Sequence, residues 1–374
     1  MRTPLAVLAC SLLACSSAAP SPAGQVSVIL SALAGESQPF LRALGGRVDR
    51  SADSVYCSGV VEGALGRHPV VVVTTGTGGD NAGPCMQEIL HGYGNRVREV
   101  IWSGIAGLSP AIGGLVDPST GALRPDPRPV ILGDVCVGVM TWSYDLHFSS
   151  VDDWRVAAEA SGNLNDPRGG WWEMKSTSAS GVVGFENVQQ YVLADRALAD
   201  EILAAAAAVR LARPTGRTLD EVKRFFSDAQ IREPRVFDYR VCGGEVAANE
   251  FFHSAVQDRL ARQYIASLIR SSGFAGSLVT ENEVIAVAGM EGASWMSVVA
   301  RWASKKGTRI GMALVRAGSN YDHQPLLPNG RPAPDATGHV PTAMEDILIG
   351  FSDDGSVLAV ENAAAVVLMT FARR

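Results

Sequence analysis

Apolar stretches that end in glycine-rich loops and continue into helical segments recur along this chain. The clearest is the run PVVVVTT over 69–75, which is followed by Gly76–Asn81 and a helical pattern over 82–93. A continuous β-branched run is typical of a strand that is covered on both faces. Strands that alternate with helices predict an α/β fold with a central mixed, mostly parallel β-sheet surrounded by helices.

The rest of the chain continues this alternation. No internal repeat and no linker-like change of composition is visible, so a single domain over 25–374 is expected, with insertions at about 109–129 and 151–240. Further strands are expected over 26–30, 97–103, 130–139, 284–288 and 309–315, the third of them interrupted at Gly133–Asp134. Helices are expected around Leu41, over 194–213 and 254–271, and over a segment that carries 295–304, with strand-like and helical segments from 356 to the end.

Residues 1–24 are expected to be a targeting segment rather than part of the fold. Arg2 is the sole charge before the apolar run Leu5–Ala14, which is about half as long as a membrane-spanning helix. The tetrapeptide over 12–15 resembles a bacterial lipobox, which would leave Cys15 as a lipidated N-terminus. Export is therefore expected, as a periplasmic or membrane-anchored lipoprotein or as a simply secreted protein, with a buried N-terminal helix as the remaining alternative.

Four further cysteines would then lie in an oxidising compartment, namely Cys57, Cys85, Cys136 and Cys242. Disulfides are permitted there. Cys85 and Cys136 stand in apolar stretches, so buried free thiols are the alternative.

Composition excludes several functions. Lys and Arg number 32 against 38 Asp and Glu, a net charge of −6 without basic blocks, which argues against nucleic-acid binding. The six cysteines and six histidines show no metal-ligand spacing, so neither a metal nor another cofactor is expected. A Gly-x-Ser-x-Gly nucleophile elbow is also missing from the sequence.

Two glycine loops follow neighbouring strands. Gly76–Asn81 lacks the Gly-Lys-Ser/Thr of a P-loop and the spacing of a dinucleotide fingerprint, and Ser103–Gly107 ends the next strand. Each loop alone could be a tight turn. Because ligands bind beyond the carboxyl ends of parallel strands, the two loops together predict one shared ligand site.

Polar residues follow the later strands in the same way. Glu291 opens a helix after an apolar strand, where it could either interact with the helix dipole or bind ligand hydroxyls. The segment Arg316–Asp322 follows another strand, although Asn and Asp are also common in turns. The aromatic pair within Asn249–His253 could pack in the core or stack on a ligand.

The order of a glycine loop, SGIAG, GDV, MEGAS and RAGSNYD resembles the nucleoside phosphorylase superfamily, which includes purine nucleoside phosphorylases and methylthioadenosine/S-adenosylhomocysteine nucleosidases. The resemblance extends from about residue 26 to residue 322. The segments TTGTGGDNA, NEFFHS and SNYD are similar to the purine nucleoside permease branch. The resemblance implies a partly barrel-like mixed sheet, a nucleoside as the small-molecule partner and a homo-oligomer.

It also implies roles for individual residues. Glu36 would activate water, although a solvated charge is the alternative, and Glu291 would bind the ribose 2′- and 3′-hydroxyls. Met290 would line the sugar and Phe251 would stack on the base, while Asn320 occupies the position of the acid that protonates the purine. The remaining substrate contacts are expected from Gly78, Ile105, Ala106 and Ser319.

Two departures shape the expected function. An amide at Asn320 cannot deliver a proton as a carboxylic acid can, which leaves Asp322 as a substitute acid. Trp102 stands near the place where phosphorylases of this family bring an arginine to phosphate, which favours water as the acceptor. We therefore expect an exported nucleosidase that cleaves the N-glycosidic bond of a purine nucleoside. The alternatives are a phosphate-dependent purine nucleoside phosphorylase and a non-catalytic nucleoside-binding or storage protein.

Overall fold

The computed structural model describes the chain from residue 24 to residue 374 with internal gaps. The segments outside the described residues are 46–47, 52–53, 116, 118–122, 144–146, 150–170, 174–190, 248–257, 259–260, 264, 267–268, 271–279, 281, 328–330, 336, 341–344 and 346–352. The expected targeting segment, Phe251 and most of the expected helix over 254–271 therefore lie outside the described part of the chain.

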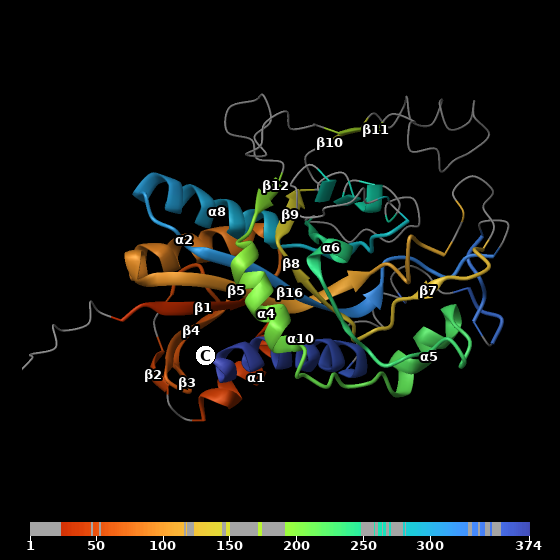
Figure 1. Ribbon diagram of the computed structural model, residues 1–374, viewed down its shortest axis with the longest axis horizontal. Coiled ribbons are helices and arrows are strands. Elements are labelled where there is room, and N and C mark those ends of the chain that lie inside the picture. Colours follow the sequence, from red (N-terminus) through yellow and green to blue (C-terminus); the bar gives the residue numbers. More distant parts are fainter. Residues whose placement is uncertain are drawn as a thin grey trace, which may run out of the picture.

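A 12-stranded mixed sheet forms the centre of the molecule (Figure 1). Its strands are β1 (Val26–Ser31), β2 (Val48–Ser51), β3 (Gly59–Leu65), β4 (His68–Thr74), β5 (Val97–Leu108), β8 (Val135–Gly138), β9 (Met140–Ser143), β12 (Tyr191–Leu193), β13 (Val236–Phe237), β14 (Gly244–Ala247), β15 (Val287–Gly289) and β16 (Gly311–Tyr321). Two small separate pairs are β6 (Ala111–Ile112) with β7 (Arg128–Pro129), and β10 (His147–Ser149) with β11 (Trp171–Glu173).

The long strand β5 organises this sheet. It pairs in parallel with β1 and with β16, and its last residues pair antiparallel with β15. Ile101 lies opposite both Ile29 of β1 and Ala313 of β16, so these three strands run side by side and end at the same edge. Four further pairs, β1–β4, β13–β8, β14–β15 and β14–β9, are also parallel, and the expected fold class is confirmed.

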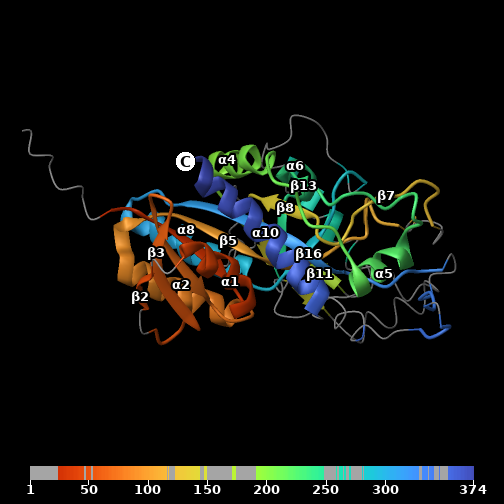
Figure 2. The ribbon, with the colours of Figure 1, turned by 90° about the horizontal axis from the view of Figure 1, so that it is seen from below.

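Helices cover both faces of the sheet. They are α1 (Ala34–Leu44), α2 (Gly79–Tyr93), α4 (Arg196–Ala206), α5 (Gly216–Phe225), α6 (Tyr239–Cys242), α8 (Gly292–Lys306) and α10 (Asp353–Arg373), with a short 3-10 turn at Gly94–Arg96. One face packs against α1, α4 and α10, and the opposite face packs against α2 and α8 (Figures 1 and 2).

The valine run of β4 shows why the sequence is apolar at every position there. Val70 and Val72 pack into the core beneath α1, whereas Val71 and Val73 pack into the core beneath α2. Side chains alternate between the two faces of a strand, so a strand that is covered on both faces has no polar position.

Helix α10 corrects the expectation of mixed strand-like and helical segments at the end of the chain. It is one continuous helix of 21 residues. It is the one described helix that is long and apolar enough to cross a membrane, and 56% of its most apolar window is buried inside the protein. Ala363, Val366 and Val367 are fully buried against the sheet, as expected for a core helix.

Several other boundaries differ from the expected ones. Helix α2 begins at Gly79 rather than at residue 82, and β5 and β16 continue to Leu108 and Tyr321, beyond the expected strand ends at 103 and 315. The strand expected over 130–139 begins only at Val135, after the expected interruption. Before Val135 the chain turns at Gly133, with a φ of 90°, and Asp134 accepts a hydrogen bond from the Ile131 N–H at 2.8 Å. Within the expected insertion, α4 packs into the core and β13 pairs with β8.

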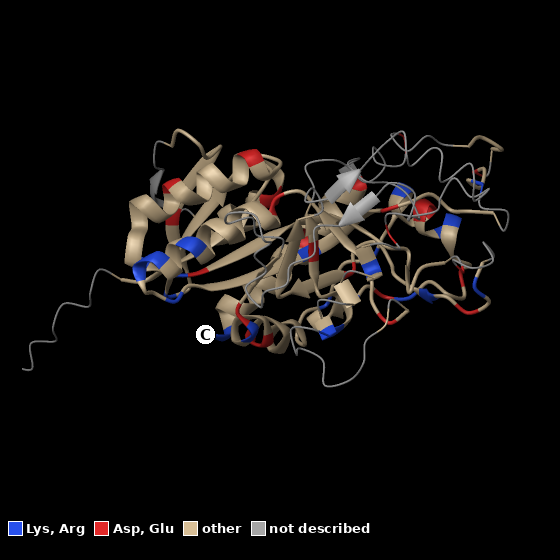
Figure 3. Ribbon diagram, turned by 90° about the horizontal axis from the view of Figure 1, so that it is seen from above, with Lys and Arg blue, Asp and Glu red and all other residues tan. Residues whose placement is uncertain are grey.

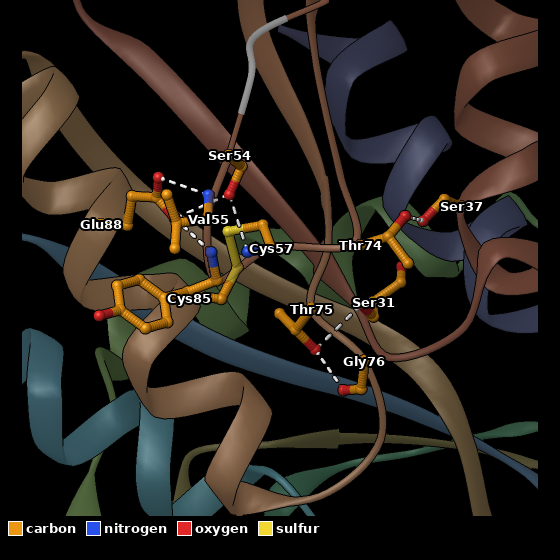
Figure 4. Close-up of a disulfide and its surroundings, with 11 residues drawn as sticks. Ser31, Ser37, Ser54, Val55, Cys57, Thr74, Thr75, Gly76, Cys85 and Glu88 are labelled. Atoms are coloured by element: carbon orange, nitrogen blue, oxygen red, sulfur yellow. Dashed lines mark hydrogen bonds between the residues drawn. A yellow bond between two sulfur atoms is a disulfide. The ribbon is translucent and has the colours of Figure 1, made fainter.

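The four cysteines form two disulfides, Cys57–Cys85 and Cys136–Cys242. All four are buried, so the alternative of free core thiols is wrong for this structure. The first disulfide joins the segment before β3 to helix α2, close to the first glycine loop (Figure 4). The second joins β8 to α6.

Candidate functional site

The carboxyl ends of β1, β5, β15 and β16 bring the predicted polar residues together. Glu36 follows β1 within helix α1, Glu291 follows β15, and Asn320 and Asp322 belong to the end of β16. Both glycine-rich segments meet the same cluster, because Gly78 N–H donates to Glu291 and Ile105 N–H donates to Glu36. The second segment, Ser103–Gly107, is part of strand β5 and not the loop that was expected after it. The expectation of one shared site at this edge of the sheet agrees with the structure.

The first glycine loop is held firmly at its base. Gly76 N–H donates to Ala32 O at 3.0 Å, and Thr75 N–H donates to Ser31 O at 2.8 Å, so the loop continues the pairing of β4 with β1. Gly76 and Gly78 have φ values of 92° and 88°, which favour glycine. The loop therefore presents the Gly78 N–H in a fixed position.

Glu36 is buried rather than solvated, so the solvated-charge alternative is wrong. One carboxylate oxygen accepts from Ala32 N–H at 2.7 Å and Leu33 N–H at 2.8 Å, and the other accepts from Ile105 N–H at 2.7 Å. Burial raises the pKa of Glu36 to about 7, against the opposing effects of Arg316 and the backbone donors. A carboxylate with this pKa can accept a proton near neutral pH.

Glu291 is also buried, and its hydrogen bonds reach outside its own helix. It is the N-cap residue of α8, yet its side chain makes no capping bond there. Instead, Oε1 accepts from Gly78 N–H at 3.0 Å and Oε2 accepts from Arg316 Nη2 at 2.8 Å. Glu291 therefore does more than interact with the dipole of α8, because its side chain also binds Gly78 and Arg316.

Arg316 lies at the centre of the cluster, and sequence reasoning assigned it no role. Its Nε donates to Glu245 Oε2 at 2.8 Å, its Nη2 contacts both Glu245 and Glu291, and its Nη1 donates to Ile105 O at 3.0 Å. Burial alone would lower the pKa of Arg316, but the adjacent carboxylates hold it above the ordinary value. The guanidinium is therefore a permanently charged partner for these carboxylates.

Arg316 also lies beside Trp102, which stands near the expected place of a phosphate-binding arginine. The guanidinium carbon lies 4.7 Å from the centre of the Trp102 ring, which is itself fully buried and stacked on Trp295 at 6.1 Å. A cation thus occupies the region near Trp102, but it comes from β16 instead of β5. It is already engaged by two carboxylates.

Glu245 on β14 is the second site residue that sequence reasoning missed. It is buried, and its Oε1 accepts from Gly292 N–H at 2.9 Å. Burial first and the neighbouring Glu291 next raise its pKa, while Arg316 opposes this rise. Two glycines in the sequence were the signal that a side chain packs closely against the backbone here. A Cβ on Gly289 would lie 2.6 Å from Glu245 Oε1, and a Cβ on Gly292 would lie 2.9 Å from the same atom.

The end of β16 carries the remaining predicted polar residues. Ser319 is buried, and its hydroxyl donates to Asn320 Oδ1 at 2.9 Å and contacts Ala106 O at 3.4 Å. The register with β5 shifts between Gly318 and Asn320, which lies opposite Gly107. Asp322 is buried immediately beyond the strand.

Solvent reaches only part of this assembly. Ile105, Gly107, Met290 and Asn320 are half-buried, whereas Ala106 and the four charged residues described above are buried. A ligand that contacts the accessible residues would therefore lie against buried, pre-oriented carboxylates. Among the described residues, no group of three or more His, Cys, Asp or Glu side chains could hold a metal ion.

Sequence comparisons give no match, either to a protein-family model or to a curated protein. The solved structure of futalosine hydrolase from Helicobacter pylori strain 26695 is similar, with 12% identity and a TM-score of 0.50 over 95% of this chain and 100% of that chain. A second similar structure is 5′-methylthioadenosine/S-adenosylhomocysteine nucleosidase from Neisseria meningitidis in complex with methylthio-immucillin-A. Its identity is 16% and its TM-score 0.48, over 92% of this chain and 98% of that chain. The structural neighbours are nucleosidases, and the chain shares the α/β fold of futalosine hydrolase, as the resemblance implied.

Proposed function

We propose that this protein is an N-ribosyl hydrolase that cleaves the glycosidic bond of a nucleoside with water. The observation that carries the proposal is the buried cluster in which Glu36, Glu245 and Glu291 surround Arg316. The fold that the chain shares with futalosine hydrolase supports the same class of reaction. The order of sequence motifs supports a purine nucleoside as the substrate.

In this proposal Glu291 binds the ribose hydroxyls. Each carboxylate oxygen has two lone pairs. Oε2 accepts from Arg316 and from Met290 N–H, whereas Oε1 accepts from Gly78 N–H and keeps acceptor capacity for a hydroxyl. The half-buried Met290 precedes Glu291 and would contact the sugar. Because its bonds to two other elements orient Glu291 before the substrate arrives, little reorganisation is needed on binding.

Glu36 acts as the general base. As the glycosidic bond breaks, C1′ gains the character of an oxocarbenium ion, which nearby carboxylates stabilise. Glu36 accepts a proton from the attacking water, and its pKa of about 7 places this step near neutral pH. The half-buried Asn320 would hold the base through its amide.

The electrostatics of the cluster favour water over phosphate as the nucleophile. Phosphate is a dianion that needs unsatisfied donors or cations. Arg316 donates to Glu245, Glu291 and the Ile105 carbonyl, and the cluster holds three carboxyl groups for this one arginine. Across the described residues, Lys and Arg are dispersed among Asp and Glu without a long basic stretch (Figure 3).

The test is a panel of purine and pyrimidine nucleosides, each incubated with the purified protein with and without phosphate and then separated by chromatography. Release of free base at the same rate in both conditions is expected. Release that requires phosphate would identify a phosphorylase. Tight binding by calorimetry without turnover would instead identify a nucleoside-binding protein.

Two variants assign the activity to the site. Glu291→Gln should lower the rate of base release by about 10²–10⁴-fold, the range for loss of a positioned catalytic group. Glu361→Gln is the matched control, because Glu361 is half exposed on α10 and pairs with Arg42. Full activity of Glu291→Gln would refute the site assignment.

We also propose that the protein is exported and forms a homo-oligomer. The two disulfides support export, since disulfides persist in oxidising compartments. Cell fractionation with labelled fatty acid tests the location and the lipidation of Cys15. Labelling that survives Cys15→Ser would contradict a lipid at that residue.

Light scattering on the purified protein tests the oligomeric state, and a monomeric mass would refute the proposed homo-oligomer.

A further inference from the structure

Cleavage of a glycosidic bond leaves the bonding electrons on the base. The base departs most readily when a proton is transferred to it, because it then leaves without a negative charge. The amide of Asn320 holds hydrogen-bond donors but no acidic proton to transfer. The proposed reaction therefore needs a proton donor on the base side of the site, a residue distinct from Glu36. The following inference rests on the proposed function and names that donor.

Asp322 lies beside Asn320 at the end of β16. Its backbone N–H donates to Leu108 O at 2.9 Å, which continues the pairing of β16 with β5. A Cβ on Gly107 would overlap Asp322 Oδ1 and would lie 3.4 Å from Asn320 Nδ2. The carboxyl and the amide thus lie together over Gly107, which is half-buried and two residues beyond Ile105.

The carboxyl of Asp322 is not satisfied by the protein. The residue is 1% exposed, and its Oδ2 is buried with no hydrogen-bond partner among the described residues. Asp258 is equally buried, but it is bonded to the Ser109 hydroxyl and, at 3.0 Å, to Arg262 Nε. Buried polar atoms without partners are rare in proteins, and at functional sites they can be groups that meet a ligand.

Burial favours the protonated form of Asp322. Burial first and the charge of Asp258 second raise the pKa of Asp322 well above its ordinary value. No described cation opposes this rise, because Arg262 is paired with Asp258. The rise favours the protonated carboxylic acid, which has one proton to give.

We propose that Asp322 is the catalytic acid that transfers its proton to a ring nitrogen of the departing base. The C1′–N bond breaks and its electron pair moves to the base, which takes the proton from Asp322. The oxygen of water bonds to C1′, and its proton passes to Glu36. Exchange with solvent then returns the proton to Asp322 and removes the one from Glu36, so that the free base and ribose are the products.

The test compares two substrates that differ in their need for a proton. A nucleoside requires protonation of its base, whereas 4-nitrophenyl β-D-ribofuranoside releases a stable phenolate without it. Asp322→Asn should lower kcat on the nucleoside by about 10²–10⁴-fold and change kcat on the riboside by less than about threefold. Asp322→Glu keeps a carboxylic acid and should cleave the nucleoside at least tenfold faster than Asp322→Asn.

The control variant is Asp228→Asn, since the side chain of Asp228 is 83% exposed and its loss should leave both rates unchanged. An equal fall on both substrates would show that Asp322 supports the structure only. An unchanged rate on the nucleoside would show that the donor is another group. If the wild-type protein cleaves neither substrate, the proposed function itself fails, which distinguishes that outcome from failure of the acid assignment.

Discussion

Replacing Arg316 by methionine tests the idea that one buried cation holds the site together. Methionine retains most of the volume and leaves Glu245 and Glu291 facing each other without a counter-charge. Both carboxylates are buried, with side chains 0% and 4% exposed. Removing one partner of a buried ion pair costs about 3–5 kcal/mol, so the free energy of unfolding at pH 7.5 should fall by that amount.

The loss should depend on pH in a defined direction. Without Arg316, the pKa of Glu245 rises further in the folded state, because its ionised form loses the cation that opposes the effect of burial. A group with a raised pKa in the folded state stabilises the fold at low pH, and that stabilisation is lost as the pH rises through this value. The difference between Arg316→Met and the wild type should therefore be smaller at pH 5 than at pH 7.5.

Urea denaturation followed by tryptophan fluorescence measures both quantities, and the buried Trp102 and Trp295 report directly on this region. Arg42→Met is the matched control, because its ion pair with Glu361 is exposed and such pairs contribute about 0–1 kcal/mol. The reasoning would be refuted if Arg316→Met lost less than about 1 kcal/mol or lost the same amount at both pH values.

Three further predictions follow from single positions. Gly104→Ala should abolish activity, because its Cβ would lie 2.7 Å from Glu36 Oε1. Gly35→Ala is the control and should remain active, since no atom lies within 4 Å of a Cβ there. The kcat for base release measures both variants, and an active Gly104→Ala would contradict the tight packing around Glu36. The rate of base release should rise with pH through about 7, because Glu36 loses its proton there, and Glu36→Gln should be inactive at every pH. A rate that does not change between about pH 6 and 8 would exclude Glu36 as the base. Replacing Cys136 by serine should destabilise the protein more than replacing Cys57. The disulfide of Cys136 spans 106 residues and that of Cys57 spans 28, for which the chain-entropy model gives a stabilisation of about 5 and about 4 kcal/mol. Urea denaturation that ranks the two variants in the opposite order would contradict that model.

Local pattern in the sequence determined the fold class and the edge of the sheet that carries the site. The valines of β4 were predictable as a two-sided buried strand because the alternation of side chains acts on neighbouring residues. That the two glycine-rich segments would meet was predictable for a similar reason, since neighbouring parallel strands end at a common edge, although the second segment proved to be part of β5. Glu291 was singled out because it follows an apolar strand, whereas Glu36 was named only through the family resemblance.

Only the tertiary structure decided what surrounds these carboxylates. Arg316 and Glu245 are 71 residues apart, and no local pattern indicates that β16 and β14 bring them into contact. The pairing of Cys136 with Cys242 and the position of Asp322 against Gly107 depend on the same long-range packing. The sequence by itself therefore determined which edge could bind a ligand, through periodicities that neighbouring residues carry. The charge balance and protonation of that edge were decided by burial and by contacts between distant segments, which exist only in the folded chain.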